Sequence, residues 1–181
     1  MIYQQSFLYS SPGMGDGNFQ KALVYLDTHN GDGARGWVVN KELDARIANK
    51  LRVGMKLQIN LPIYYGGPVD VNSVFILHTP DVIIQSTQQI NEDLCITRDK
   101  QMIEMFNLKQ FPKKWKIIVG HSSWGAGQLE SEMLGSRTNG RCLWGNVKYT
   151  PDLMWNIEPK AQWQTSIERS AEEYVSNILK F

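Results

Sequence analysis

The sequence predicts an α/β fold, in which a single compact domain spans residues 1–181. A chain of 181 residues corresponds to about one domain, because domains average roughly 150 residues. Short apolar runs rich in β-branched residues alternate with runs of helical periodicity. We therefore expect a mixed β-sheet, or a small barrel-like sheet, flanked by helices and followed by a C-terminal amphipathic helix.

The predicted strands are short, apolar and rich in β-branched residues. Trp115–Val119 is the clearest of them, and its continuous apolar character predicts a central position in the sheet. Pro80 separates two neighbouring runs, because proline cannot donate to a ladder. In chain order the predicted strands are Ala22–Asp27, Trp37–Asn40, Ser73–Leu77, Asp81–Ile84, Leu94–Ile96 and Trp115–Val119.

Helices are predicted from helical spacing and from capping residues. The first covers Glu42–Leu51, and the second covers Arg98–Phe106 with Thr97 as its N-cap. The last begins with a capping box formed by Thr165 and Glu168. Its apolar stripe is expected to close the chain's own core, and docking of a partner helix is the alternative. The stripes are Leu43, Ile47 and Leu51 in the first helix and Ile167, Ala171, Tyr174, Val175, Ile178 and Leu179 in the last.

Composition excludes several classes of protein. A net charge of +1 and a pI of about 7.7 are too low for a generally basic nucleic-acid binder, so direct nucleic-acid binding is not expected. No apolar run is long enough for a membrane span, and Met1–Ser10 lacks the features of a secretory signal. Cys95 and Cys142 are far apart and are predicted to be reduced, as in a cytoplasmic protein, with Cys142 buried on a strand.

Lysines are concentrated just before the central strand, where they flank Phe111 and Trp115. Such a cluster could bind phosphate or nucleic acid. Because the cluster is short, a solvated loop between a helix and a strand is the favoured interpretation. The lysines are Lys109, Lys113, Lys114 and Lys116.

Four glycine-rich stretches supply the candidate ligand-binding residues. In Ser10–Phe19, three glycines in five residues allow N–H groups to turn toward an anion, and Met14 and Asp16 are the candidates. In Gly31–Lys41, a glycine-rich turn leads into a strand that ends at Asn40. Asn40 is expected either to face a ligand crevice or to cap the next helix.

The third stretch, Tyr64–Val69, predicts a sharply defined turn with exposed N–H groups, because it contains Gly66, Gly67 and Pro68. His78 follows at the end of an apolar strand, where an imidazole can act as acid, base or ligand. A structural hydrogen-bonding role is the commoner one for a single histidine in such a place.

The fourth stretch, Gly120–Glu132, is the most distinctive. A glycine-rich loop is expected to follow the central strand and to lead into a helix that opens at Gln128. Strand, loop and helix N-terminus in this order can bind an anion through free N–H groups and the helix dipole. The candidates here are Trp124, Gly127, Gln128 and Glu130.

Familiar catalytic and cofactor signatures are absent from the sequence. There is no GxxxxGK[ST], GxSxG or HExxH pattern. Gly31–Gly36 has GxGxxG spacing, but it leads into the predicted strand Trp37–Asn40 and not into a helix, so it does not predict a dinucleotide site. His29, His78 and His121 are well separated, so no metal site is expected, and no cofactor is expected either.

Taken in order, the four stretches resemble the YqgE/AlgH family of bacterial proteins over about residues 5–180. Gly17 and Glu42 stand where the family usually has proline, and Ser136–Asn139 lacks the family's Asn and Trp. The resemblance implies one α/β domain and a cytoplasmic location. Some members are described as transcriptional regulators, and no activity is established for the family. The matching residues are Pro12, Met14, Asp16, Phe19, Gly33, Ala34, Gly36, Asn40, Gly66 to Val69, Leu77, His78, Gly120, Trp124, Gly127, Gln128, Leu129, Glu130 and Glu132.

The sequence therefore favours a regulatory protein that binds a small polar or anionic molecule between Ser11–Phe19, Gly66–Val69 and Gly120–Gln128. Its effect on transcription is expected to be indirect, through a protein partner. One alternative is an enzyme, a hydrolase or transferase, with His78 as the base and Gly120–Gln128 stabilising negative charge. The other is a protein-interaction module whose glycines only allow tight packing.

Overall fold

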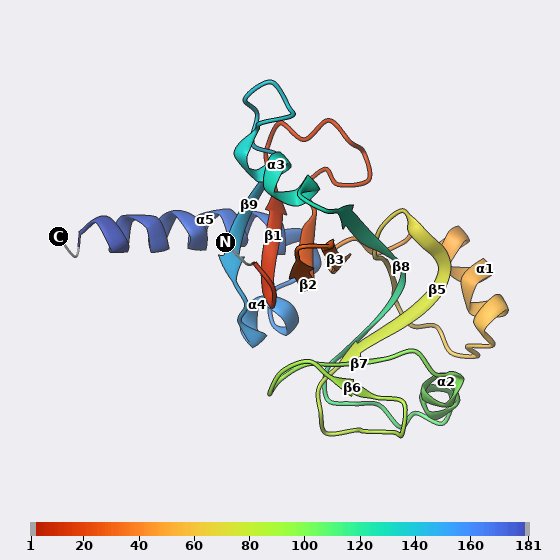
Figure 1. Cartoon of the computed structure of the whole chain (residues 1–181). Coiled ribbons are helices and arrows are strands. Elements are labelled where there is room, and N and C mark those ends of the chain that lie inside the picture. The colour runs from red at the N-terminus through yellow and green to blue at the C-terminus, as the bar shows by residue number, and fades with distance from the viewer. Residues whose placement is uncertain (1–2, 180–181) are drawn as a thin grey trace.

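The computed structural model describes residues 3–179 and shows a mixed α/β fold built on one curled, nine-stranded sheet (Figure 1). The predicted fold class is confirmed. The strand order is β6-β7-β5-β8-β3-β2-β1-β9, with β4 beside β8. The strands are β1 (Ser6–Ser10), β2 (Leu23–Asn30), β3 (Gly33–Val38), β4 (Ile63–Tyr65), β5 (Val69–His78), β6 (Gln88–Gln89), β7 (Cys95–Thr97), β8 (Trp115–Gly125) and β9 (Trp144–Lys148).

The central strand β8 joins the two halves of the sheet. Its first residues pair antiparallel with β5 and parallel with β4, whereas its last residues pair antiparallel with β3. Every other pairing between named strands is antiparallel, so the sheet is mixed through β4 alone. The strand predicted over Trp115–Val119 is therefore central, but it runs six residues further than predicted, to Gly125.

In the described part of the chain, five helices pack around this sheet. In Figure 1, α1 and α2 lie beside β5 and β8, whereas α4 and α5 lie near β1 and β9. Helix α1 begins after Asp44, whose carboxylate accepts hydrogen bonds from the N–H groups of Arg46 and Ile47. The helices are α1 (Ala45–Met55), α2 (Lys100–Asn107), α3 (Gln128–Leu134), α4 (Pro151–Trp155) and α5 (Pro159–Ile178).

Three predicted helix starts are wrong because other residues cap the helices. The first helix starts at Ala45 rather than Glu42, and Ile47 of its predicted buried stripe is exposed. Thr97 belongs to β7, and Asp99 caps α2 instead. The predicted capping box at Thr165 lies inside α5, which begins at Pro159, a residue suited to a first helical position.

The strand predicted over Asp81–Ile84 is also wrong, because this segment forms a turn. The Asp81 carboxylate accepts hydrogen bonds from the Thr79 hydroxyl and from the N–H of Lys113. These two hydrogen bonds hold the turn beside the start of β8. Asn40 lies two residues beyond the end of β3.

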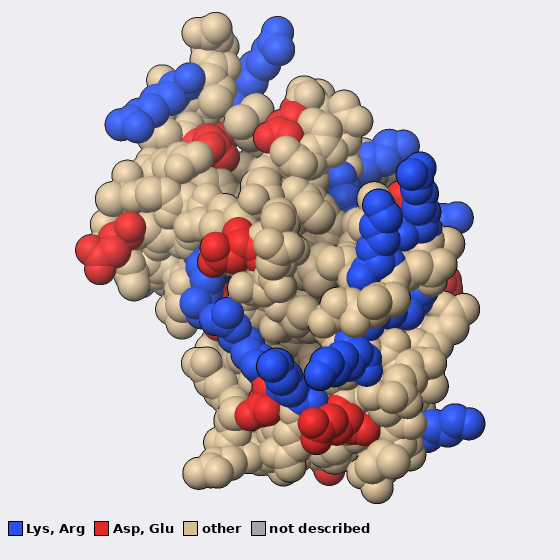
Figure 2. Space-filling view, turned by 90° about the vertical axis from the view of Figure 1, so that its right-hand side faces the viewer, with Lys and Arg blue, Asp and Glu red and all other residues tan. Residues whose placement is uncertain are grey.

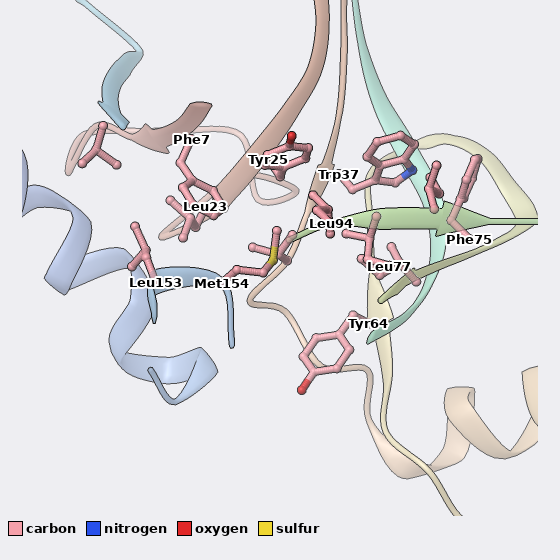
Figure 3. Close-up of a cluster of buried hydrophobic side chains, with 14 residues drawn as sticks. Phe7, Leu23, Tyr25, Trp37, Tyr64, Phe75, Leu77, Leu94, Leu153 and Met154 are labelled. Carbon is pink, nitrogen blue, oxygen red and sulfur yellow. The ribbon is translucent and has the colours of Figure 1, made fainter. Parts of the chain in front are cut away.

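Three clusters of buried side chains form the core. The first fills the inside of the curled sheet and is closed by Leu153 and Met154 of α4 (Figure 3). The second lies on the outer face of β1–β3 under α3, where Trp124 and Trp144 meet. The third lies under α1 and α2 against β5 and β8.

The C-terminal half of α5 extends beyond the rest of the molecule (Figure 1). Residues 171–179 are exposed, and Leu179 retains 79% of its surface. The prediction that this stripe closes the chain's own core is therefore wrong for Ala171, Tyr174, Val175, Ile178 and Leu179. The first half of the helix does pack, through Gln162 and Ser166, onto α4 and the sheet.

Both cysteines are free, as predicted. Cys95 is buried in β7, whereas Cys142 is exposed in the loop before β9, so its predicted burial on a strand is wrong. Within residues 3–179, no helix combines the length and the apolar character that crossing a bilayer requires.

Candidate functional site

A pocket of about 400 Å³ opens beside the loop that joins β1 to β2. We call it the loop pocket. Its size falls within the range typical of small-molecule sites. It is lined by Ser11, Pro12, Met14, Gly17, Gln20, Lys21 and Lys41.

The loop is anchored by a buried side chain and shaped by a turn. Met14 is buried in the second core cluster beneath the loop. Asp16 forms the turn, because its carboxylate accepts from the N–H of Asn18 at 2.8 Å and its carbonyl accepts from the N–H groups of Phe19 and Gln20, both at 3.0 Å. Residues of the first glycine-rich stretch therefore anchor and shape this wall of the pocket.

Asn40 and Lys41 fasten the loop to the sheet. Asn40 accepts from the Leu23 N–H at 2.8 Å and donates to the carbonyl of Lys21 at 2.9 Å. The Lys41 ammonium donates to the carbonyl of Asn18 at 2.9 Å and to that of Gly17 at 3.3 Å. Asn40 therefore bridges two parts of the main chain, and the alternative prediction that it caps the next helix is wrong, since Asp44 does so.

Two lysines give the loop pocket its positive charge. Partial burial lowers the pKa of Lys41, and the nearby Asp16 carboxylate works in the opposite direction. The Lys21 ammonium lies 5.9 Å from the centre of the Trp163 ring, at the first half of α5. An ammonium that is partly shielded from water forms stronger hydrogen bonds with an anion than one in bulk solvent.

The other glycine-rich stretches converge on the underside of the same loop. The Tyr65 hydroxyl, from the third stretch, donates to the Asn18 side chain at 2.9 Å. Phe19 stacks on Trp124 of the fourth stretch, with ring centres 6.4 Å apart, and meets Trp144 edge-on at 5.3 Å. All four stretches therefore contact residues 11–21, but only the first two line the pocket.

The glycines of the third and fourth stretches pack backbone against backbone. A Cβ on Gly66 would lie 2.3 Å from the Gly120 carbonyl oxygen. A Cβ on Gly67, whose φ is +146°, would lie 2.3 Å from the His121 carbonyl oxygen. Pro68 follows at the exposed start of β5. Close packing between the β4–β5 turn and β8 accounts for these glycines without a ligand.

Trp124 and Gln128 donate to the carboxylate of Glu132, which the sequence placed in the family motif but not among the ligand-binding candidates. Glu132 accepts from Trp124 Nε1 at 3.1 Å, Trp144 Nε1 at 2.7 Å and Gln128 Nε2 at 2.8 Å. Gln128 also accepts from the N–H of Gly125 at 3.0 Å. We call these residues the Glu132 network. Both indole N–H groups are satisfied inside the protein.

The fourth stretch opens a helix at Gln128 as predicted, but the loop predicted before it is largely strand. Gly120–Gly125 continues β8, and Gly127 is the N-cap of a helix of only seven residues. The Glu130 carboxylate lies 3.0 Å from Nε2 of the buried His29. These contacts hold α3 on the sheet.

His78 lies in the interior, away from the loop pocket. Its Nδ1 is 2.9 Å from the Thr79 carbonyl, and its Nε2 is 2.8 Å from the Thr97 hydroxyl. Burial lowers its pKa, so the neutral ring is favoured at pH 7. His78 pairs with Trp115, nine residues before Trp124 on β8, which is roughly 30 Å along a strand. The structure therefore does not bring His78 and Gly120–Gln128 together.

Of the predicted ligand-binding residues, Met14 lines the loop pocket, while Asp16 and Asn40 shape its wall. Sequence reasoning missed Gln20, Lys21 and Lys41, although Lys41 directly follows Asn40. Within residues 3–179, no three His, Cys, Asp or Glu side chains gather closely enough to hold a metal ion.

The curled mixed sheet and the pocket beside its β1–β2 loop define a small α/β protein. Residues 7–175 match the family described as AlgH-like, and the chain belongs to that family.

A UPF0301 protein of Cupriavidus pinatubonensis is 35% identical over 166 residues, which cover 89% of this chain and 84% of that protein. A UPF0301 protein of Vibrio parahaemolyticus is 29% identical, with 90% of this chain and 89% of that protein covered. The solution structure of the AlgH protein from Pseudomonas aeruginosa is similar, with a TM-score of 0.71, 28% identity and coverage of 93% of this chain and 89% of that chain.

Proposed function

We propose that the protein binds a small polar or anionic molecule in the loop pocket and acts as a ligand-dependent regulatory protein. One observation carries the proposal: Lys21 and Lys41 flank a pocket of about 400 Å³ whose wall is fastened to the sheet by Asn40. Binding an anion there would draw the Lys41 ammonium toward the ligand and loosen its hydrogen bonds to the loop. Ligand binding would thereby change the loop's surface.

The regulatory part of the proposal assigns the effect to a protein partner in the cytoplasm rather than to DNA. Figure 2 shows Lys and Arg gathered on the face that carries α1, β5 and β8, with Asp and Glu among them. A net charge of +1 gives little general attraction to a polyanion. A DNA duplex therefore belongs in the binding panel as a competing ligand.

The test is thermal unfolding with phosphate, nucleotides, dicarboxylates and a short DNA duplex, all at matched ionic strength. An anion at 100 times its Kd would stabilise the folded chain by about 2.7 kcal/mol. That corresponds to roughly 5–10 °C in Tm for a chain of this size. A shift with DNA alone would overturn the indirect mechanism.

Variants locate the site. Lys21→Gln and Lys41→Gln are expected to remove the shift, while Lys50→Gln, an exposed lysine of α1, is the matched control and should retain it. Lys41→Arg keeps the charge and should preserve part of the shift. No shift with any anion, or an equal loss in Lys50→Gln, would contradict the proposed site.

A further inference from the structure

Lys116 occupies a core position of β8. Side chains alternate along a strand, and Ile117 and Val119 belong to the third core cluster while Ile118 belongs to the first. Lys116 therefore shares the face of Ile118 and retains only 6% of its surface. This finding corrects the prediction that Lys116 belongs to a solvated loop.

The Lys116 ammonium has no ion-pair partner. Its Nζ lies 4.4 Å from the centre of the Tyr64 ring, and Figure 3 shows that ring at the edge of the first cluster. Among residues 3–179, no carboxylate oxygen lies within 4.0 Å of it. A buried ammonium without a carboxylate partner is costly. Such a group is a candidate for a functional role.

The protonation of Lys116 reflects this environment. Burial lowers its pKa to about 8, while the carboxylates of Glu158 and Glu42 work in the opposite direction from the start of α5 and the segment before α1. The other charged group at the site is Lys114, which is exposed. A substantial fraction of Lys116 is therefore a neutral amine near pH 7.5.

A second pocket, of about 280 Å³, lies against Lys116 between β4, β8 and the α4–α5 junction. We call it the lysine pocket. Its walls are largely aromatic and apolar, and Glu158 stands among them. The apolar walls are Leu61, Pro62, Tyr64, Trp115, Trp155 and Ile157.

We propose that Lys116 forms a reversible imine with a small aldehyde or ketone that carries a flat apolar body. The Lys116 nitrogen attacks the carbonyl carbon, and the carbonyl oxygen leaves as water with the two hydrogens of the neutral amine. The C=N bond replaces the C=O bond, and no oxidant or reductant is needed. Glu158 would stabilise the protonated imine by charge.

A neutral carbonyl compound suits this pocket better than an anion does. Glu158 and Glu42 act electrostatically on Lys116, so the site offers an anion no excess positive charge. An apolar ring would gain contacts with the aromatic walls. The inference is independent of the loop pocket, which is lined by other residues.

The test uses benzaldehyde with cyanoborohydride on the wild-type chain, so that no variant has to fold, and maps the reduced adducts by mass spectrometry. At pH 7.5, a pKa of about 8 leaves roughly a quarter of Lys116 neutral, against about 0.1% of an ordinary lysine. We expect Lys116 to be modified at least about tenfold faster than Lys113 and Lys114. Its rate should saturate with benzaldehyde concentration and reach half its plateau near pH 8.

Variants extend the test. Glu158→Gln should move the half-maximal pH of Lys116 modification downward, because the carboxylate raises the lysine pKa. Lys114→Arg, the matched control on the pocket rim, should leave Lys116 modification unchanged. Equal rates at Lys114 and Lys116, a rate linear in benzaldehyde, or modification of Lys116 only in urea would each overturn the proposal.

Discussion

Replacing Glu132 with alanine would leave two buried indole N–H groups without an acceptor. Trp124 and Trp144 both donate to the same carboxylate oxygen, and both side chains are buried in the second core cluster. Gln128 loses its Nε2 partner as well, but it is exposed and water can replace the carboxylate. The perturbation therefore acts mainly through the two tryptophans.

The magnitude follows from the cost of leaving buried donors unsatisfied. Each such donor costs about 1–3 kcal/mol, so the two together should lower the free energy of unfolding by about 2–6 kcal/mol. Glu132→Gln keeps an amide oxygen in place and should cost about 1–2 kcal/mol. Glu130→Ala is the matched control on the same helix. The Glu130 side chain is 41% exposed, but its loss leaves one buried donor, Nε2 of His29, without an acceptor, so this variant should cost about 1–3 kcal/mol, roughly half of the effect of Glu132→Ala.

Urea unfolding followed by tryptophan fluorescence measures these differences. We expect Cm to be lowest for Glu132→Ala, with Glu130→Ala and Glu132→Gln between it and the wild type, and with an unchanged m-value. For a chain of this size, where 1 kcal/mol corresponds to about 2–4 °C, the alanine variant should lose about 4–24 °C in Tm. If Glu132→Ala unfolds within 0.5 kcal/mol of the wild type (about one third of a single buried hydrogen bond), or no earlier than Glu130→Ala, the reasoning is refuted.

Further predictions concern backbone packing, pH and the exposed helix. Gly66→Ala should lower the free energy of unfolding by more than about 2 kcal/mol, because its Cβ would meet a backbone oxygen of β8 at 2.3 Å, while Gly13→Ala, with open space around it, should stay within about 0.5 kcal/mol in the same urea assay. Burial lowers the folded pKa of His78, so the unfolded chain protonates first and stability falls as pH drops through about 6.5. His78→Gln should reduce this slope between pH 7 and 5 and leave the part due to His121, whose pKa burial also lowers. Val175→Ser should change the free energy of unfolding by less than about 0.5 kcal/mol, because this residue is exposed.

Local sequence character predicted several strands of the sheet, because an apolar, β-branched run is typical of a buried strand. It identified β2, β5, β7 and β8 in this way. It missed β1 and β9, whose pairing with each other is set by tertiary contacts. It also ended β8 too early, because Gly120 and Gly125 are typical of loops when neighbouring strands are not known.

The helix starts were predicted wrongly because local sequence does not decide which residue caps a helix. Asp44 and Asp99 cap α1 and α2 through hydrogen bonds that several nearby residues could have made. The terminal stripe of α5 has helical periodicity whether or not a surface covers it. Periodicity therefore predicted the helix correctly and its burial wrongly.

The candidate site was predictable to the extent that its residues lie close in sequence. The first stretch located Met14 and Asp16 at the pocket wall. Lys41 could not be identified in this way, since its partners Gly17 and Asn18 precede it by more than 20 residues. Lys116 did carry a local signal: it is the single charged residue inside the apolar run Trp115–Val119, and alternation places it on a core face.

The third and fourth glycine-rich stretches hold the loop of the loop pocket in place and do not line the pocket themselves. Gly66 and Gly67 let the β4–β5 turn lie directly on β8, and this packing positions the adjacent Tyr65 against Asn18 of the loop. The Glu132 network holds Trp124 beneath Phe19 in the same way. Substitutions in these stretches should therefore act on stability, whereas changes at Lys21 and Lys41 should act on binding, and a glycine variant that remains folded should keep the ligand Kd of the wild type.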